Sequence, residues 1–276
     1  MNNSPIGIFD SGLGGLTVAK ELAELMPHES LIYVGDQARC PYGSRDCAEV
    51  QNFVLQICNF LQKQGCKLIV IACNTATSCA LEVAQKHCDV PVLGVINAGA
   101  RAAINATETA KLALIGTQRT IESAAYPKAI HALDASVEIY EAVTPELTTI
   151  VEACTNDEMA VCVQKRGEYY HLVEGYLRPL LKRQPDTLLL GCTHYPVLTE
   201  ALRSVAGQEL KIVCAAGEVS VEARSLLGQR EQLADSSSKP QSIFYTTGDN
   251  TEDFARKGSR IFGSGLDRVK YLSLDD

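Results

Sequence analysis

Three absences in the 276-residue sequence each exclude a class of protein. No run of Lys or Arg is longer than two residues, and the formal net charge is −8. Nucleic acid is therefore not expected as the primary ligand, because nucleic-acid-binding proteins carry a basic patch. The longest apolar stretches, such as residues 68–73, are too short to span a bilayer. The N-terminus has no cationic segment followed by an apolar one, so we expect no signal peptide and a cytoplasmic protein without a membrane segment.

The cysteines also lack the spacings of a metal site. None of the eleven cysteines forms a CxxC pair, and the five histidines are scattered, so no metal is expected. Disulfides are not expected in a reducing compartment, and the odd cysteine count agrees with this. Most of the cysteines are therefore predicted to be small buried apolar side chains.

The sequence does contain a regular alternation of strand and helix patterns. Hydrophobic residues make up 46% of the chain and charged residues 21%, a globular composition, and the length suits two domains or one large α/β unit. Short apolar runs predict strands, and Val50 to Leu61 has the helical period. The predicted strands are residues 6–9, 31–34, 68–72, 92–95, 112–115, 137–140, 188–190 and 210–213. This pattern predicts an α/β fold with parallel sheets, in which ligands bind beyond the carboxyl ends of the strands. Residues 244–247 and 269–272 are expected to form a late hairpin or a sheet edge.

Small, polar or nucleophilic residues follow the predicted strands directly. They are Asp10-Ser11-Gly12, Gly35-Asp36, Cys73-Asn74-Thr75, Gly116-Thr117 and Gly191-Cys192-Thr193-His194. Residues 68–77 and 188–196 share one plan, an apolar strand followed by Cys and a polar turn. Two similar halves that face each other would place one thiol on each wall of a shared cleft.

The glycine-rich loop at residues 10–15 permits three interpretations. Gly12, Gly14 and the later Asp36 fit a dinucleotide site, but Thr17 replaces the third glycine and the Asp10 carboxylate would repel a phosphate. A plain tight turn is the second interpretation. We favour the third, a loop whose backbone N–H groups and Ser11 hydroxyl hold a small polar ligand at a helix N-terminus.

Two cysteines stand where reactive thiols are expected. Cys73 ends a strand and starts a helix, whose N-terminus is expected to lower the thiol pKa from about 8.5. Cys192 has the same placement, and His194 is close enough in sequence to share its proton. The alternative for each of the two is a buried core cysteine without a chemical role. A Cys–His pair also suits the nucleophile and base of a hydrolase. Two thiols, however, suit the removal of an α-proton from one face of a carbon and its return on the other.

Five motifs resemble those of glutamate racemases in order and spacing, over about residues 5 to 228. The motifs are DSGLGG at 10–15, GD at 35–36, PYG at 41–43, ACNTAT at 72–77 and GCTHYP at 191–196. The resemblance implies that Cys73 and Cys192 are the catalytic thiols, with Asp10 and His194 as their respective partners. Aspartate racemases typically have an acid where His194 stands.

The resemblance also implies a set of substrate contacts. Residues that hold the carboxylates and the ammonium of the substrate would be Asp10, Ser11, Tyr42, Gly43, Asn74, Thr75, Thr193 and His194, with Thr117 and Thr120 from a less strict motif. Asp36 and Glu152 resemble two further acids near the cleft. For Glu152, a solvated helix face is the alternative.

The fold implied by the resemblance has two flavodoxin-like domains with the substrate in the cleft between them. The first domain would comprise residues 1–97 plus 208–276, and the second 98–207. The implied reaction interconverts L- and D-glutamate without pyridoxal phosphate or metal, and supplies D-glutamate for peptidoglycan synthesis. Members are commonly homodimers, and some also bind DNA gyrase. Residues 213–217 and Cys40 depart from the pattern.

Two other functions stay open at this point. One is an aspartate or broader amino-acid racemase. The other belongs to a different class, a binding protein that closes on an amino acid and in which the cysteines are structural.

Overall fold

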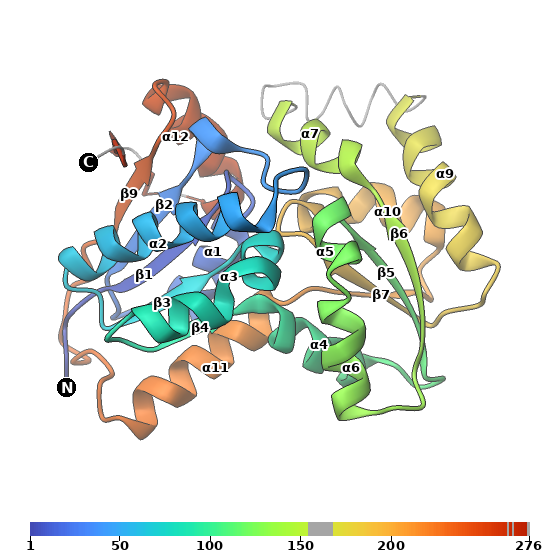
Figure 1. Cartoon of the computed structure of the whole chain (residues 1–276), viewed down its shortest axis with the longest axis horizontal. Coiled ribbons are helices and arrows are strands. Elements are labelled where there is room, and N and C mark those ends of the chain that lie inside the picture. The colour runs from blue at the N-terminus through green and yellow to red at the C-terminus, as the bar shows by residue number, and fades with distance from the viewer. Residues whose placement is uncertain (154–167, 264, 267, 275–276) are drawn as a thin grey trace.

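The computed structural model describes residues 1–153, 168–263, 265–266 and 268–274, and it contains two parallel β-sheets that lie side by side (Figure 1). The first sheet has six strands in the order β10-β9-β2-β1-β3-β4. Its strands are β1 (Ile6–Asp10), β2 (Leu31–Gly35), β3 (Leu68–Ile71), β4 (Val92–Gly94), β9 (Ile243–Thr246) and β10 (Val269–Tyr271). All of its neighbouring strands pair in parallel.

The second sheet has four strands in the order β6-β5-β7-β8, again all parallel. Its strands are β5 (Lys111–Gly116), β6 (Glu138–Val143), β7 (Thr187–Gly191) and β8 (Lys211–Val213). The order β2-β1-β3-β4 in the first sheet and β6-β5-β7-β8 in the second is the same flavodoxin-like order. The predicted α/β class is therefore confirmed, and Cys73 and Cys192 each follow the third strand of their half.

Helices cover both faces of each sheet, as near-continuously apolar strands require. The helices are α1 (Leu16–Leu25), α2 (Cys47–Lys63), α3 (Asn74–His87), α4 (Val95–Ala106), α5 (Gln118–Glu122), α6 (Ala125–Leu133), α7 (Pro145–Ala153), α9 (Glu168–Leu181), α10 (Thr199–Ala206), α11 (Ala216–Gln229) and α12 (Thr251–Phe262). In the first half, α1, α11 and α12 pack on one face and α2 and α3 on the other. In the second half, α7, α9 and α10 pack on one face and α4 and α6 on the other.

The helix predicted around Val50 to Leu61 is α2. Its apolar residues lie on one stripe and bury Val50, Val54, Ile57 and Leu61 against the first sheet. No helix in the described ranges is long and apolar enough to cross a membrane.

One expectation about strand pairing differs from the structure. The late hairpin is wrong: β9 and β10 pair in parallel, and α12 provides the crossover that a parallel pair needs. The expectation of a sheet edge is correct, because β10 is the outermost strand. The strand β8 pairs with β7, so the second sheet extends to Val213.

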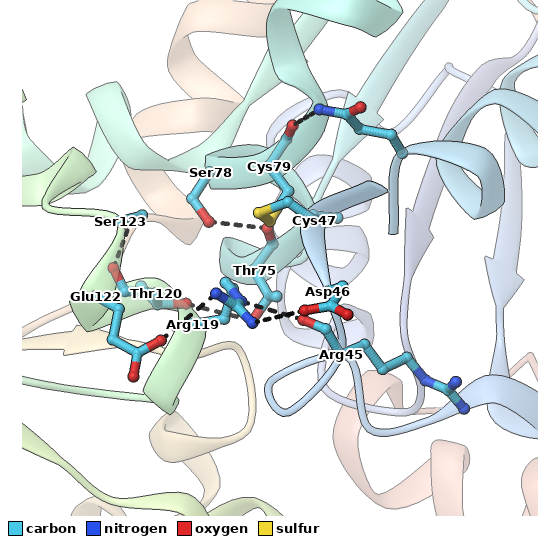
Figure 2. Close-up of a disulfide and its surroundings, with 12 residues drawn as sticks. Arg45, Asp46, Cys47, Thr75, Ser78, Cys79, Arg119, Thr120, Glu122 and Ser123 are labelled. Carbon is cyan, nitrogen blue, oxygen red and sulfur yellow. Dashed lines mark hydrogen bonds and ion pairs between the residues drawn. A yellow bond between two sulfur atoms is a disulfide. The ribbon is translucent and has the colours of Figure 1, made fainter. Parts of the chain in front are cut away.

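The expectation of no disulfide is also contradicted. Cys47, the first residue of α2, and Cys79 of α3 form a disulfide with a Cα–Cα distance of 5.1 Å (Figure 2). The expectation rested on the compartment alone and took no account of the packing of α2 against α3. Next to this bond, Arg119 of α5 donates from Nε to the Arg45 carbonyl at 3.1 Å and pairs with Asp46 at 3.5 Å. The start of α2 is thus tied to α3 and also contacts the second half.

Candidate active site

A cleft lies where the carboxyl ends of the two sheets face each other. Its atom-free space is about 280 Å³, part of which is open to solvent. The lining residues are Ser11, Pro41, Tyr42, Gly43, Cys73, Asn74 and Thr75 from the first half, and Thr117, Thr148, Gly191, Cys192, Thr193 and His194 from the second. The cleft therefore brings together both predicted cysteines, one from each half.

Cys73 caps the N-terminus of α3. Its Sγ accepts a hydrogen bond from the Ala76 N–H at 3.4 Å and lies 3.9 Å from the Ser11 Oγ. Burial and the negative charge of Asp10 raise the pKa of Cys73, and the Ala76 N–H only partly opposes them. The expectation of a lowered pKa is therefore wrong. The reason is burial: only 6% of Cys73 is exposed, so the cost of desolvating its thiolate outweighs the stabilisation that the N-terminus of α3 provides.

Cys192 follows β7 and contacts two side chains of its own half. Its Sγ lies 3.5 Å from the His194 Nδ1 and 3.6 Å from the Thr148 Oγ1. A helix was expected to start directly after Cys192. The structure instead has a short 3₁₀ turn at Tyr195–Leu198, and the helix α10 begins only at Thr199. The local partner of this thiol is therefore an imidazole and not the end of a long helix.

His194 forms a buried ion pair with Glu152 of α7. The Nε2–Oε1 distance is 2.6 Å. Burial would raise the pKa of Glu152, but the hydrogen bonds and charge of His194 outweigh it and lower the pKa to about 2. Burial would lower the pKa of His194, but Cys192 and Glu152 outweigh it and raise the pKa well above its usual value. A protonated His194 thus places a donor beside the Cys192 Sγ, and Glu152 is not on a solvated face.

Asp10 is fully buried at the end of β1. Its Oδ2 accepts from the Gly12 N–H at 3.1 Å, and its Oδ1 accepts from the Thr193 hydroxyl at 3.2 Å. Burial raises the pKa of this carboxyl. Asp10 therefore joins the two halves through Thr193 and places negative charge near Cys73.

The threonine hydroxyls of the two halves meet at the cleft wall. Thr75 Oγ1 lies 2.9 Å from Thr117 Oγ1 and 3.3 Å from Thr120 Oγ1. Asn74 Oδ1 accepts from the Tyr126 hydroxyl at 2.6 Å. These buried hydroxyl and amide groups can both donate and accept, as recognition of carboxylate and ammonium groups requires.

Asp36 lies beneath the cleft rather than in its lining. It accepts hydrogen bonds from the Tyr42 hydroxyl, from Arg39 Nε at 2.7 Å and from Thr247 Oγ1 at 2.8 Å. Asp36 thereby fixes Tyr42, which does line the cleft. A Cβ added to Gly43, the next residue, would lie 2.8 Å from the Thr117 Cβ, so this position favours glycine.

The glycine loop makes room for side chains of the second half. A Cβ on Gly12 would overlap the Glu152 carboxylate, and a Cβ on Gly14 would lie 2.5 Å from both His194 Nδ1 and Thr193 Oγ1. Ser11 lines the cleft, as the favoured interpretation expects. The glycines themselves, however, are required by the close approach of the two halves.

Sequence reasoning missed Thr148 and the contact between Gln37 and Glu152. Thr148 stands four residues before Glu152 on α7, so the two share a helix face, and this spacing was a usable signal. Nothing in the local sequence indicated that Gln37 Nε2 lies 2.8 Å from Glu152 Oε2. Among the described residues, no group of three or more His, Cys, Asp or Glu side chains is placed to hold a metal ion.

The fold and the facing thiols define an α/β protein with a two-cysteine cleft, and comparisons with known proteins specify it further. The family model described as "Asp/Glu/Hydantoin racemase" matches residues 16–217. A glutamate racemase of Lysinibacillus sphaericus is 42% identical over 247 residues, which cover 89% of this chain and 90% of the relative.

Solved structures agree with the sequence comparison. Glutamate racemase isoform RacE1 from Bacillus anthracis superimposes with a TM-score of 0.90 and 39% identity, over 99% of each chain. Glutamate racemase from Francisella tularensis, solved in complex with D-glutamate, gives a TM-score of 0.87 and 31% identity, over 100% of this chain and 99% of the other. The chain belongs to the Asp/Glu/hydantoin racemase family.

Proposed function

We propose that the protein is a glutamate racemase that interconverts L- and D-glutamate without a cofactor. The observation that carries this proposal is the pair of thiols, Cys73 and Cys192, that enter one small cleft from opposite halves. Relatives named glutamate racemase at 38–42% identity support glutamate as the substrate. The product D-glutamate would serve peptidoglycan synthesis in the cytoplasm.

The two thiols would act as interchangeable acid and base. One thiolate removes the α-proton, which leaves a carbanion stabilised through the adjacent carboxylate, and the other thiol donates its proton to the opposite face. After each turnover the protonation states of Cys73 and Cys192 are exchanged, so the reverse reaction starts without a further step. Asp10 would assist proton transfer at Cys73, and His194 with Glu152 at Cys192.

Polar groups around the cleft would hold the rest of the substrate. Its carboxylates and ammonium would be bound by Asp10, Ser11, Tyr42, Gly43, Asn74, Thr75, Thr117, Thr120, Thr193 and His194. Thr148 joins this set because its hydroxyl faces Cys192. Bound groups of the substrate would replace the hydroxyl contacts that these residues now make with one another.

A chiral assay tests the proposed function. The enzyme is dialysed against a chelator, kept reduced because oxidised thiols cannot act as bases, and incubated with L-glutamate. We expect D-glutamate to accumulate, as measured by circular dichroism. Faster turnover of aspartate would favour the broader racemase, and glutamate binding without turnover would favour a binding protein.

Solvent deuterium tests the two-thiol mechanism. Each thiol serves one face, so early product should carry deuterium while recovered substrate still carries hydrogen, starting from either enantiomer. Slow exchange of thiol protons in a closed cleft underlies this difference. Substantial early label in the recovered substrate, in both directions, would count against two bases.

The quaternary and domain organisation are part of the same proposal. Each sheet with its helices would form one domain, the first comprising about residues 1–97 plus the chain after Val213, and the second the residues between. This boundary replaces residue 207 because β8 pairs with β7. We expect a homodimer, which sedimentation velocity would detect.

A further inference from the structure

The carboxylate of Glu152 is held from the half of the molecule to which it does not belong. Gln37 Nε2 donates to Oε2 at 2.8 Å, and the Leu13 N–H donates to Oε1 at 3.1 Å. Both donors come from the first half, whereas Glu152 and its partner His194 come from the second. The orientation of this carboxylate therefore depends on a contact that exists only when the two halves are together.

We propose that Gln37 is a positioning residue for racemisation, which acts by holding Glu152 Oε2 so that Oε1 faces the His194 Nε2. The proposal rests on the proposed function. The His194 Nε2 hydrogen then points to Glu152, so the other ring nitrogen, Nδ1, is directed at the Cys192 Sγ 3.5 Å away. A histidine whose one nitrogen is fixed by a carboxylate has the other nitrogen oriented for proton transfer.

The buried amide of Gln37 is a costly group to retain for stability alone. Within the described part of the chain, its Oε1 is buried without a hydrogen-bond partner. An orphaned buried acceptor destabilises a fold, and such atoms call for an explanation. An apolar side chain of similar length would avoid the orphan but would lose the donor to Glu152. Gly248 packs closely against the side chain of Gln37: a Cβ added to Gly248 would lie only 3.2 Å from the Gln37 Cβ.

The backbone of Glu152 is fixed from the first half as well. Lys257 of α12 donates from Nζ to the Glu152 carbonyl oxygen at 3.0 Å and forms an ion pair with Asp253 at 3.0 Å. A lysine on one of the last carbonyls of a helix stabilises that helix end. Gln37 and Lys257 thus fix the side chain and the main chain of the same residue.

The surroundings of Glu152 and His194 explain why donors are needed there. The titratable and charged groups that face the pair from neighbouring elements are Asp10, Tyr33, Cys40, Cys192 and Lys257. Burial raises the pKa of Tyr33 and of Cys40, so both stay neutral, and Asp10 is the buried acid of this set whose charge opposes that of Glu152. The amide of Gln37 supplies a hydrogen bond to it without adding a charge.

The first test compares Gln37→Met with wild type in both directions by circular dichroism. Methionine keeps the side-chain length but removes the donor, so thermal unfolding should stay near wild type while kcat falls about tenfold. His194→Asn, measured in parallel, identifies the direction of racemisation that depends more on His194. The kcat of Gln37→Met should fall more in that direction. KM should fall with kcat there, because the equilibrium between enantiomers fixes the ratio of the kcat/KM values of the two directions. Gln229→Met is the matched control, since Gln229 Nε2 donates to the Oγ of the exposed Ser225 at 3.1 Å, and it should behave as wild type.

A second test adds a charge to the same position. Gln37→Glu donates to Glu152 only when one carboxyl of the pair is protonated. Its activity relative to wild type should therefore rise as the pH falls, which a purely structural role would not produce. In a Glu152→Gln background, Gln37→Met should add little, because the two residues act through one contact.

The outcomes separate this inference from the proposed function. A wild-type enzyme that does not racemise glutamate would overturn the proposed function. An active wild type with an unaffected Gln37→Met, or with equal losses in both directions and no pH signature for Gln37→Glu, would overturn the role of Gln37 alone.

Discussion

Replacement of Gly14 by alanine tests whether the glycine loop serves the approach of the two halves. The new Cβ would lie 2.5 Å from His194 Nδ1 and Thr193 Oγ1, whereas ordinary contacts begin at 3.4 Å. The side chains that hold Cys192 in place must therefore move by 3.4 − 2.5 = 0.9 Å, or the halves must separate by that amount. A misplacement of about 1 Å can cost about 100-fold in rate, so we expect kcat to fall by about that factor.

Stability should respond differently from activity. The backbone of Gly14 has no positive φ, so alanine is compatible with its conformation, and the substitution acts across the cleft rather than within a core. Gly15→Ala provides the contrast, because its Cβ would meet the Tyr33 hydroxyl at 2.9 Å and Asp10, both within the first half. We expect Gly14→Ala to unfold near the wild-type temperature and Gly15→Ala to unfold well below it.

A control and two assays complete this experiment. A Cβ on Gly217, in α11, meets nothing within 4 Å, so Gly217→Ala should keep full activity and gain about 0.5–1 kcal/mol from helix propensity. Circular dichroism measures racemisation, and thermal melts measure stability. If Gly14→Ala keeps a third or more of the wild-type kcat, or melts as early as Gly15→Ala, the interlocking of the two halves at this loop is refuted.

Three further predictions follow from the site and the disulfide. Cys73→Ala and Cys192→Ala should each abolish racemisation, with a smaller loss of stability than the roughly 2–5 kcal/mol of large core truncations. If either variant keeps more than a small fraction of the wild-type turnover, measured by circular dichroism, that cysteine is not catalytic. Glu152→Gln should be less stable than wild type, as measured by urea denaturation at a series of pH values. Its deficit should be full between about pH 4.5 and 6.5, shrink as the pH falls toward 2 because the carboxylate pKa is depressed, and shrink again as the pH rises through the elevated pKa of His194; a deficit that does not vary with pH would contradict the ion pair. Reduction of the disulfide, whose cysteines are 32 residues apart, should lower the free energy of unfolding by about 3–4 kcal/mol, and Cys47→Ser should show the same loss without reductant; identical urea curves with and without dithiothreitol would exclude this role.

The cleft could be predicted because its residues follow strands that are legible in the sequence. The apolar runs that end before Cys73 and Cys192 place both residues at the carboxyl ends of parallel strands, and this rule holds in the structure. The repeated motif also indicated two similar halves, which the matching strand orders confirm.

What could not be predicted depends on distances between segments far apart in the chain. The pKa of Cys73 rises because packing buries it, and a helix N-terminus read from sequence carries no information on burial. Gln37 meets Glu152 across 115 residues of sequence, and Cys47 meets Cys79 through the packing of two helices. The parallel pairing of β9 with β10 likewise depends on α12 between them, because two short strand patterns do not specify their direction.

The strand order of the first sheet has a consequence for the synthesis of the chain on the ribosome. Strands β1 to β4 emerge first, all four strands of the second sheet follow, and β9 and β10 emerge last. Until β9 arrives, β2 has an open edge although all its side chains are destined for burial, and such edges invite wrong pairing. A nascent chain that stops after Gln229 would hold every cleft-lining residue on an unsealed sheet. Completion of the first sheet during synthesis therefore depends on its last strands, which are not among the residues that line the cleft.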